Sequence, residues 1–69
     1  MKIIELYWDR KRIIYRNGDI EISREEALRK AEQKEYSGVS INWDGSQGPI
    51  SIKVYQEMQR MKSELEALF

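Results

Sequence analysis

An Asn17-Gly18 pair, set between two stretches of alternating apolar and polar residues, constrains the fold more than any other feature of this sequence. Asn-Gly is the strongest short signal for a two-residue β-hairpin loop, because a type I′ turn needs positive φ at both central positions. A turn at this pair would place Tyr15 opposite Ile20 and keep both side chains on one face. The sequence therefore predicts a β-hairpin centred on Asn17-Gly18.

A second turn, through Asp9–Arg12, would pair Trp8 with Ile13 across another hairpin. Residues two apart along a strand share a face, so the two turns can be checked against each other. Both turns give the same apolar face, which is formed by Ile4, Leu6, Trp8, Ile13, Tyr15, Ile20 and Ile22. We expect a three-stranded antiparallel meander at about residues 2–8, 12–16 and 19–22.

The residues after the meander change from strand signals to helix signals. Ser23 can cap a helix N-terminus, and Glu26 completes the capping box three residues later. We expect a helix over 23–36, with Gly38 as its C-terminal stop. Residues 39–43 alternate again and predict a fourth, short strand. The predicted fold class is therefore α+β.

A run rich in glycine and polar residues leads from this strand to the C-terminal segment, which is rich in helix formers. Ser51 can cap a long amphipathic helix over about 51–69. The alternation of Ile50, Ile52 and Val54 also fits a strand, because these residues are β-branched. We favour the helix and leave the strand as the alternative at its start.

Composition limits how so short a chain can be stabilised and what it can catalyse. Its 69 residues include no cysteine and no histidine, which removes disulfides, thiol chemistry and imidazole ligands. We expect a single domain, residues 1–69, whose small core favours oligomerisation. Twelve basic and twelve acidic residues cancel, so net charge indicates no partner. The absence of a spanning run and of signal-peptide features favours the cytoplasm, with no membrane partner.

The C-terminal helix carries an apolar stripe at heptad spacing, which is typical of a helix that packs against another helix. A helix of this length should extend beyond strands of five to seven residues, leaving its last apolar side chains in need of cover. The alternative is that the stripe packs on the domain's own sheet. The predicted self-interface of a homodimer consists of Val54, Met58, Met61, Leu65, Leu68 and Phe69.

The first hairpin tip mixes basic and aromatic side chains, which can indicate contact with nucleic acid. Neighbouring acids at Glu5, Asp9 and Asp19 weaken the positive field, so a solvated turn is the favoured interpretation. The candidate contacts are Tyr7, Arg10, Lys11, Arg12 and Arg16.

The loop after the fourth strand could shape a pocket for a ligand or a partner, because it is small, polar and rich in glycine. It matches neither a phosphate-binding loop nor a calcium loop, and no metal site is predicted. A simple connection is the alternative. The candidate residues are Trp43, Asp44, Ser46 and Gln47.

No enzyme activity and no cofactor are expected, because no carboxylate pair or activated serine is recognisable. The leading hypothesis is a small regulatory or inhibitory binding protein, a homodimer that occupies a partner protein surface or sequesters a small ligand. A phage or mobile-element accessory protein is one form that such a protein takes. The alternatives are a nucleic-acid-binding module and a structural subunit whose Tyr7 and Ile14 face meets a neighbour.

Overall fold

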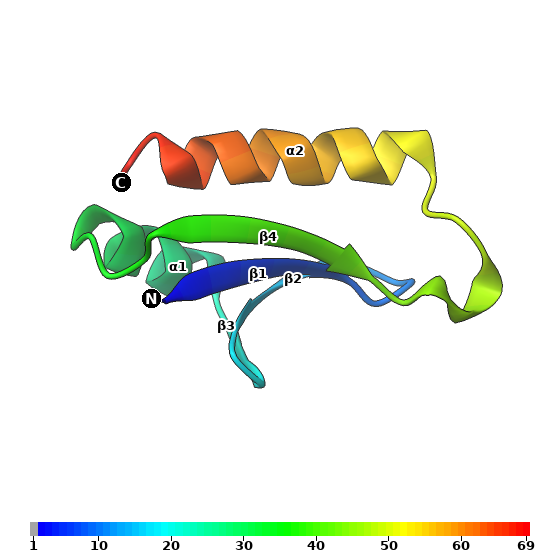
Figure 1. Cartoon of the computed structure of the whole chain (residues 1–69), viewed down its shortest axis with the longest axis horizontal. Coiled ribbons are helices and arrows are strands. Elements are labelled where there is room, and N and C mark those ends of the chain that lie inside the picture. The colour runs from blue at the N-terminus through cyan, green and yellow to red at the C-terminus, as the bar shows by residue number, and fades with distance from the viewer. Residues whose placement is uncertain (1) are drawn as a thin grey trace.

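The computed structural model describes residues 2–69, apart from the side chain of Gln47. It contains a mixed sheet, two α-helices and a short 3₁₀ helix (Figure 1). The elements in chain order are β1 (Ile3–Trp8), β2 (Ile13–Asn17), β3 (Ile20–Ile22), α1 (Arg24–Glu32), β4 (Gly38–Trp43), η1 (Gly45–Gln47) and α2 (Ile52–Glu66). The predicted α+β class, with a strand meander and a long C-terminal helix, is confirmed.

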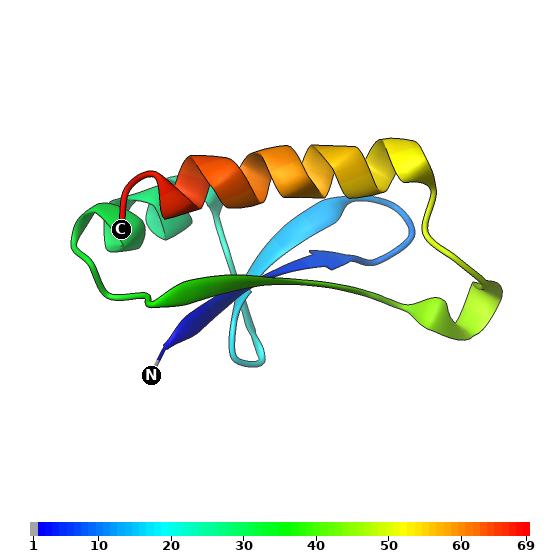
Figure 2. The same ribbon diagram turned by 45° about the horizontal axis from the view of Figure 1, so that its top comes forward.

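The four strands lie in the order β3-β2-β1-β4. β1 and β2 pair antiparallel, as do β2 and β3, whereas β4 returns to lie parallel beside β1. α2 runs back over β4, and α1 lies beside the C-terminal end of α2 (Figures 1 and 2). Both helices lie on one face of the sheet and leave the other face open. The strand order makes β4 one edge of the sheet.

The second hairpin has the predicted faces but a different register. Tyr15 pairs with Ile22, and Asn17 pairs with Ile20, so the loop consists of Gly18 and Asp19. Gly18 has a φ of 67°, and a positive φ at the first of two loop residues is the pattern of a type II′ turn. The expected turn at Asn17-Gly18 is therefore wrong by one position. The pairing moves by two residues, which leaves every side chain on its predicted face.

α1 begins as predicted but ends earlier. The Ser23 side chain accepts a hydrogen bond from the Glu26 amide at 3.1 Å, which caps the N-terminus. Lys34 takes the left-handed conformation with a φ of 60°, and its amide and that of Glu35 bond back to the last turn. This is a Schellman ending, which closes the helix before Gly38. The expected helix stop at Gly38 is therefore wrong, because Gly38 is the first residue of β4.

Residues 52–54, for which a helix and a strand were both considered, form the first turn of the C-terminal helix. The Ser51 hydroxyl accepts a hydrogen bond from the Val54 amide at 3.2 Å, and the helix begins at Ile52. Residues 50–54 therefore do not form a strand. The helix ends at Glu66, three residues short of the expected end at Phe69, and Ala67 is its C-cap.

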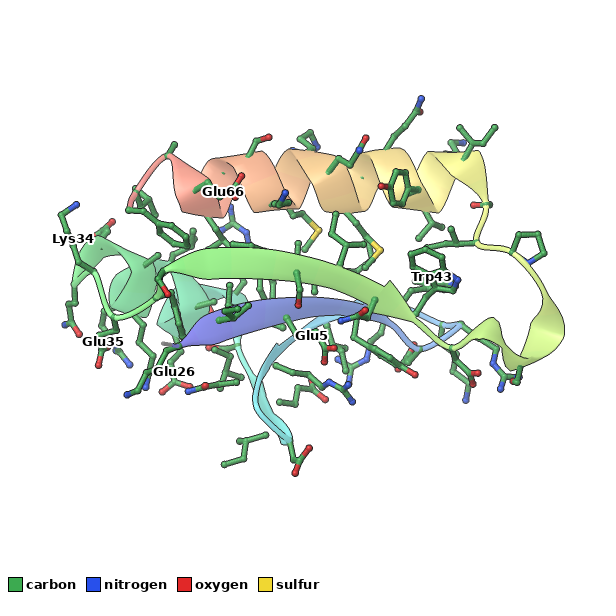
Figure 3. All side chains as sticks on the ribbon, viewed as in Figure 1. Glu5, Glu26, Lys34, Glu35, Trp43 and Glu66 are labelled. Carbon is green, nitrogen blue, oxygen red and sulfur yellow. The ribbon has the colours of Figure 1, made fainter. Side chains whose placement is uncertain are left out.

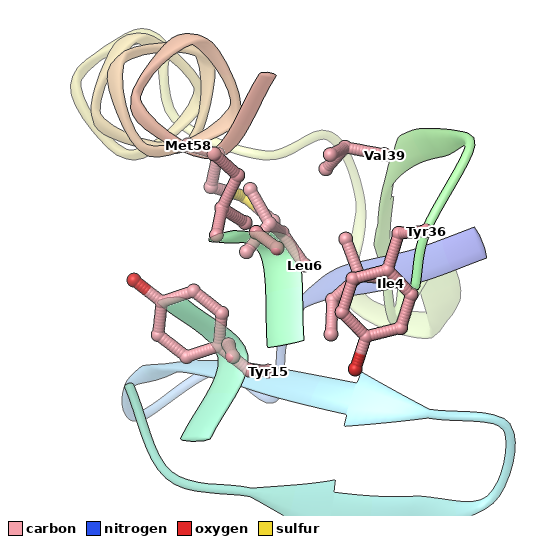
Figure 4. Close-up of a cluster of buried hydrophobic side chains, with 9 residues drawn as sticks. Ile4, Leu6, Tyr15, Tyr36, Val39 and Met58 are labelled. Carbon is pink, nitrogen blue, oxygen red and sulfur yellow. The ribbon is translucent and has the colours of Figure 1, made fainter. Parts of the chain in front are cut away.

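The buried side chains form one cluster between the sheet and the two helices (Figure 4). β1 contributes Ile4 and Leu6, which are fully buried, and α2 contributes Met58 from above. α1 contributes the buried Ala27 and Ala31, and its Leu28 packs partly buried against the same cluster. This cluster includes every residue of the predicted apolar face except Ile20, which is 68% exposed on the short edge strand β3.

Candidate protein-interaction surface

β4 presents an unpaired strand edge along one side of the sheet. Within the described residues it pairs only with β1, which leaves its outer side open. The Asp44 amide donates to the Trp8 carbonyl at 3.4 Å, so the even-numbered positions of this strand direct their backbone groups toward β1. Successive residues point to opposite sides, and the outward N–H and C=O groups therefore belong to Val39, Ile41 and Trp43.

The sequence of β4 does not protect this edge. Proteins usually guard edge strands with charged residues, proline or a bulge, because an open edge can pair with another chain. β4 reads GVSINW and has none of these residues. The other edge strand, β3, is only three residues long and includes the charged Glu21. The two edges of the sheet therefore differ in their capacity to accept a further strand.

Exposed apolar side chains lie next to the end of β4. The Trp43 and Tyr55 rings meet edge to face, with centroids 6.2 Å apart, and each residue is 37% exposed. Ile52, in the first turn of α2, is 76% exposed. Together with Ile50 these residues line a shallow groove of about 410 Å³, which Gln56 and Gln59 border. We call Trp43, Ile50, Ile52 and Tyr55 the β4–α2 patch, and Figure 3 shows Trp43 between the sheet and the helix.

The flank of α2 above the β4 edge continues from this patch. Positions three or four apart on a helix share a face. The flank consists of Ile52, Tyr55, Gln59, Lys62 and Glu66. It is apolar at its N-terminal end and charged at its C-terminal end, where Lys62 Nζ lies 3.9 Å from a Glu66 oxygen. An apolar half and a charge-balanced half thus border the open strand.

The predicted self-interface on α2 occupies the neighbouring face of the helix, and the chain's own core covers much of it. Met58 is 0% exposed and Leu65 is 1% exposed, because both pack on the sheet. Val54, Met61, Leu68 and Phe69 are partly buried against the same cluster. Met58 and Leu65 therefore fit the alternative interpretation, in which the stripe packs on the domain's own sheet. Neither side chain is accessible to a partner in this fold.

The predicted ligand loop is held by contacts within the chain. One Asp44 oxygen accepts a hydrogen bond from the Ser46 amide at 2.9 Å and caps η1. The other accepts two from Arg10, one of them at 3.1 Å, and Arg10 also donates to the Ser46 hydroxyl at 2.9 Å. The Arg10 hydrogen bonds, followed by the Ser46 amide, lower the pKa of Asp44 to about 2. Asp44 and Ser46 are thus engaged with Arg10 of the same chain, whereas the Gln47 side chain lies outside the described part.

The candidate nucleic-acid residues do not form one surface. Tyr7 and Arg16 lie on the open face of the sheet, where the Arg16 guanidinium covers the Tyr7 ring at 4.1 Å. Arg16 also pairs with Glu5 at 2.6 Å, and Asn42 donates to the other Glu5 oxygen at 2.5 Å. The ring predicted to stack on a base is therefore occupied by a cation of the same chain.

The hairpin tip itself is locally neutralised. An Asp9 oxygen accepts hydrogen bonds from the amides of Lys11 and Arg12, each at 2.8 Å. These bonds, led by the one from Arg12, lower the pKa of Asp9. The Arg12 side chain then reaches Glu21 at 3.1 Å. Each tip arginine thus has an acidic partner, which weakens any field that could attract a phosphate backbone.

A second groove, of about 420 Å³, separates α2 from β2 and β3. Its rim holds three ion pairs, and each arginine meets a glutamate of the same groove. Its floor includes the nearly buried Tyr15, whose pKa burial raises. The ion pairs are Arg12–Glu21, Arg24–Glu64 and Arg60–Glu57. Because these charges satisfy one another, the groove does not indicate a charged ligand.

Sequence reasoning missed the β4 edge and most of the β4–α2 patch. Trp43 was a candidate only as part of the loop, and Ile52 and Tyr55 lie outside the heptad stripe. Two signals could have found this surface: a strand with no charged residue, and large apolar residues on the flank of a helix whose other face is already apolar. Which strand forms the edge is not encoded locally.

Residues 2–69 contain no cluster of acidic side chains that could hold a metal ion. Over the same residues, no helix has the length and apolar character needed to cross a bilayer. Comparison with protein-family models gives no match, and comparisons with curated proteins and with solved structures give none either.

Proposed function

We propose that this chain is a small non-enzymatic binding protein that acts by occupying the surface of another protein chain. The observation that carries the proposal is the unprotected edge of β4, bordered by the exposed β4–α2 patch. In strand addition, main-chain hydrogen bonds supply affinity and neighbouring side-chain pockets supply specificity. The edge offers the first component and the patch offers the second.

The chemistry of the patch favours an extended, uncharged protein segment as the partner. Its rings and Ile52 can bury apolar side chains, and buried aromatic residues dominate binding energy at protein interfaces. Gln56 and Gln59 form a neutral rim. The proposed function is regulatory or inhibitory, because a chain of this kind changes what its partner can contact without performing chemistry.

Site-specific photocrosslinking in the native host tests this proposal. A photoreactive amino acid at Gln59, beside the β4 edge, is expected to give covalent adducts with another protein chain. The matched control carries the same residue at Ile20, on the opposite edge strand β3. No adduct from position 59, or equal adducts from both positions, would reject strand addition at β4.

A further inference from the structure

We propose that the strand that adds to β4 is the β4 strand of a second copy of this chain. The two strands run antiparallel about a two-fold axis at Ile41, which joins both sheets into one and places both α2 helices on the same face. This inference rests on the proposed function, since it names the occupant of the same edge.

The backbone of β4 is self-complementary about Ile41. A two-fold axis perpendicular to the sheet keeps the helices of both copies on one face. This requires odd-numbered residues of one β4 to lie opposite odd-numbered residues of the other, because alternate residues point to opposite faces. With the axis at Ile41, Val39 lies opposite Trp43 of the second copy. All outward-pointing N–H and C=O groups of β4 are then paired, through about six main-chain hydrogen bonds. The outward groups are centred on this residue, so no other register pairs all of them.

The flank of α2 brings no like charges together in the same arrangement. Trp43 contacts Tyr55, and Ile41 lies two residues, or about 7 Å, back along β4. That distance is about four residues of α2, which puts the axis at the level of Gln59. Lys62 then faces Gln56 of the second copy, and Glu66 faces Ile52, so no like charges are opposed.

The small size of the chain favours a second copy as the strand that adds to the β4 edge. A core of this size supplies about 3–5 kcal/mol, and natural domains so small usually add disulfides, a metal or oligomerisation. With no cysteine and no histidine in the sequence, oligomerisation is the option that remains. A joined sheet would also cover Ile52 and Tyr55, which the single chain exposes.

Sedimentation equilibrium of the full chain, with circular dichroism to verify folding, tests the proposal. The wild type is expected to have twice the 8.3 kDa mass of one chain. Gln59→Lys places two ammonium groups at the axis, and we expect it to weaken dimerisation by at least about tenfold. Gln59→Ala is the matched control, because it shortens the same exposed side chain without adding charge.

A second variant tests the backbone pairing. Ile41→Pro removes an outward N–H while leaving the bonds between β1 and β4 in place, since proline is tolerated on the open side of an edge strand. It is expected to be a folded monomer, and Ile41→Val is expected to remain a dimer. A wild-type monomer, or a Gln59→Lys dimer as tight as wild type, would overturn the proposal.

The two proposals fail in different ways. If the wild type is a monomer but position 59 still crosslinks in the host to a chain of another mass, the second copy is rejected and strand addition stands. If a dimer forms but neither Gln59→Lys nor Ile41→Pro weakens it, the dimer uses another surface and the second copy is rejected at β4. Strand addition is rejected as well only when position 59 gives no adduct in the host.

Discussion

Arg10 and Asp44 connect two loops that are separated by 34 positions in sequence. The contact draws the first hairpin tip against the loop that follows β4, and it depends on the ionised carboxyl. The Arg10 hydrogen bonds are the main reason why the pKa of Asp44 falls from 3.8 to about 2. Because the folded pKa is lowered, the contribution of this contact to stability is complete above pH 3.8 and is lost as pH falls toward 2.

Titration of Asp44 by carbon NMR of its carboxyl group checks this account. The wild-type midpoint is expected at about 2, and Arg10→Gln should raise it toward 3.8 because the main donor is removed. Lys11→Gln removes a neighbouring charge but not these hydrogen bonds, so it serves as the control. An unchanged midpoint in Arg10→Gln would mean that the contact does not form in solution.

The Tyr36 hydroxyl is buried, and none of the described residues gives it a hydrogen-bond partner. Burial is also the main cause of the raised pKa of Tyr36. An unsatisfied buried polar group costs about 1–3 kcal/mol. We therefore expect Tyr36→Phe to increase the free energy of unfolding by about 1 kcal/mol, measured by urea denaturation. A loss of stability would show that the hydroxyl has a partner in solution.

The residue scale is also where sequence reasoning reached its limit. It grouped Asp44 with Ser46 as a candidate ligand loop, and the Ser46 amide does donate a hydrogen bond to the Asp44 side chain. Their partner is Arg10, which the sequence had offered only as a candidate nucleic-acid contact on a tip expected to be a solvated turn. Spacing along the chain describes local turns well, but an ion pair between distant segments depends on how the sheet is ordered.

The second hairpin shows how an element can be predicted correctly from a misplaced turn. Asn17-Gly18 was predicted as the two-residue loop, yet Gly18 occupies the first loop position rather than the second. The alternation of the strands nevertheless assigned the buried face correctly, because the pairing moved by an even number of residues. The end of α1 was less predictable, since Lys34 adopts a left-handed conformation that favours glycine or asparagine.

Substitutions in the second hairpin distinguish the two turns. Gly18→Ala should lower the free energy of unfolding by about 1–2 kcal/mol, because the φ of 67° is costly for a residue with a Cβ atom. No neighbouring atom lies within 4 Å of the new Cβ, so the cost is purely conformational. Asn17→Val should be tolerated, because Asn17 is the last residue of β2. A large loss of stability in Asn17→Val, measured by thermal denaturation, would instead support the type I′ turn.

At the scale of the whole molecule, one face of α2 packs in the core and an adjacent face is exposed. Met58 fills the core, whereas Ile52 projects into solvent six positions earlier. Truncating a buried methionine to alanine costs about 2–5 kcal/mol, which is comparable to the stability of a core of this size. We expect Met58→Ala to unfold the chain at ambient temperature, as seen by circular dichroism.

Ile52→Ala is the matched control on the same helix. It removes a mostly exposed side chain, so the free energy of unfolding of a single chain should change by less than about 0.5 kcal/mol. Equal destabilisation by the two substitutions would show that the face of α2 has been misassigned.

The sequence predicted which segments form helices and strands, but not which strand lies at the edge. The stripe through Met58 and Leu65 suggested an interface because its spacing is that of helix pairs, and a stripe of this kind also suits a sheet. Only the return of β4 to the side of β1 decides that the core face is covered and the flank is not. That choice depends on the packing of the whole chain.

The parallel pairing of β1 with β4 also has a consequence for the order of folding events. The hairpins close short loops and form in about 1–10 μs, whereas β4 must bring Gly38 beside Ile3 across the whole intervening chain. Closing a longer loop carries a larger entropy cost, so this strand docks after the hairpins. The edge is then absent from chains that have completed only their hairpins. If a partner recognises β4 as proposed, it would therefore select molecules that have finished folding.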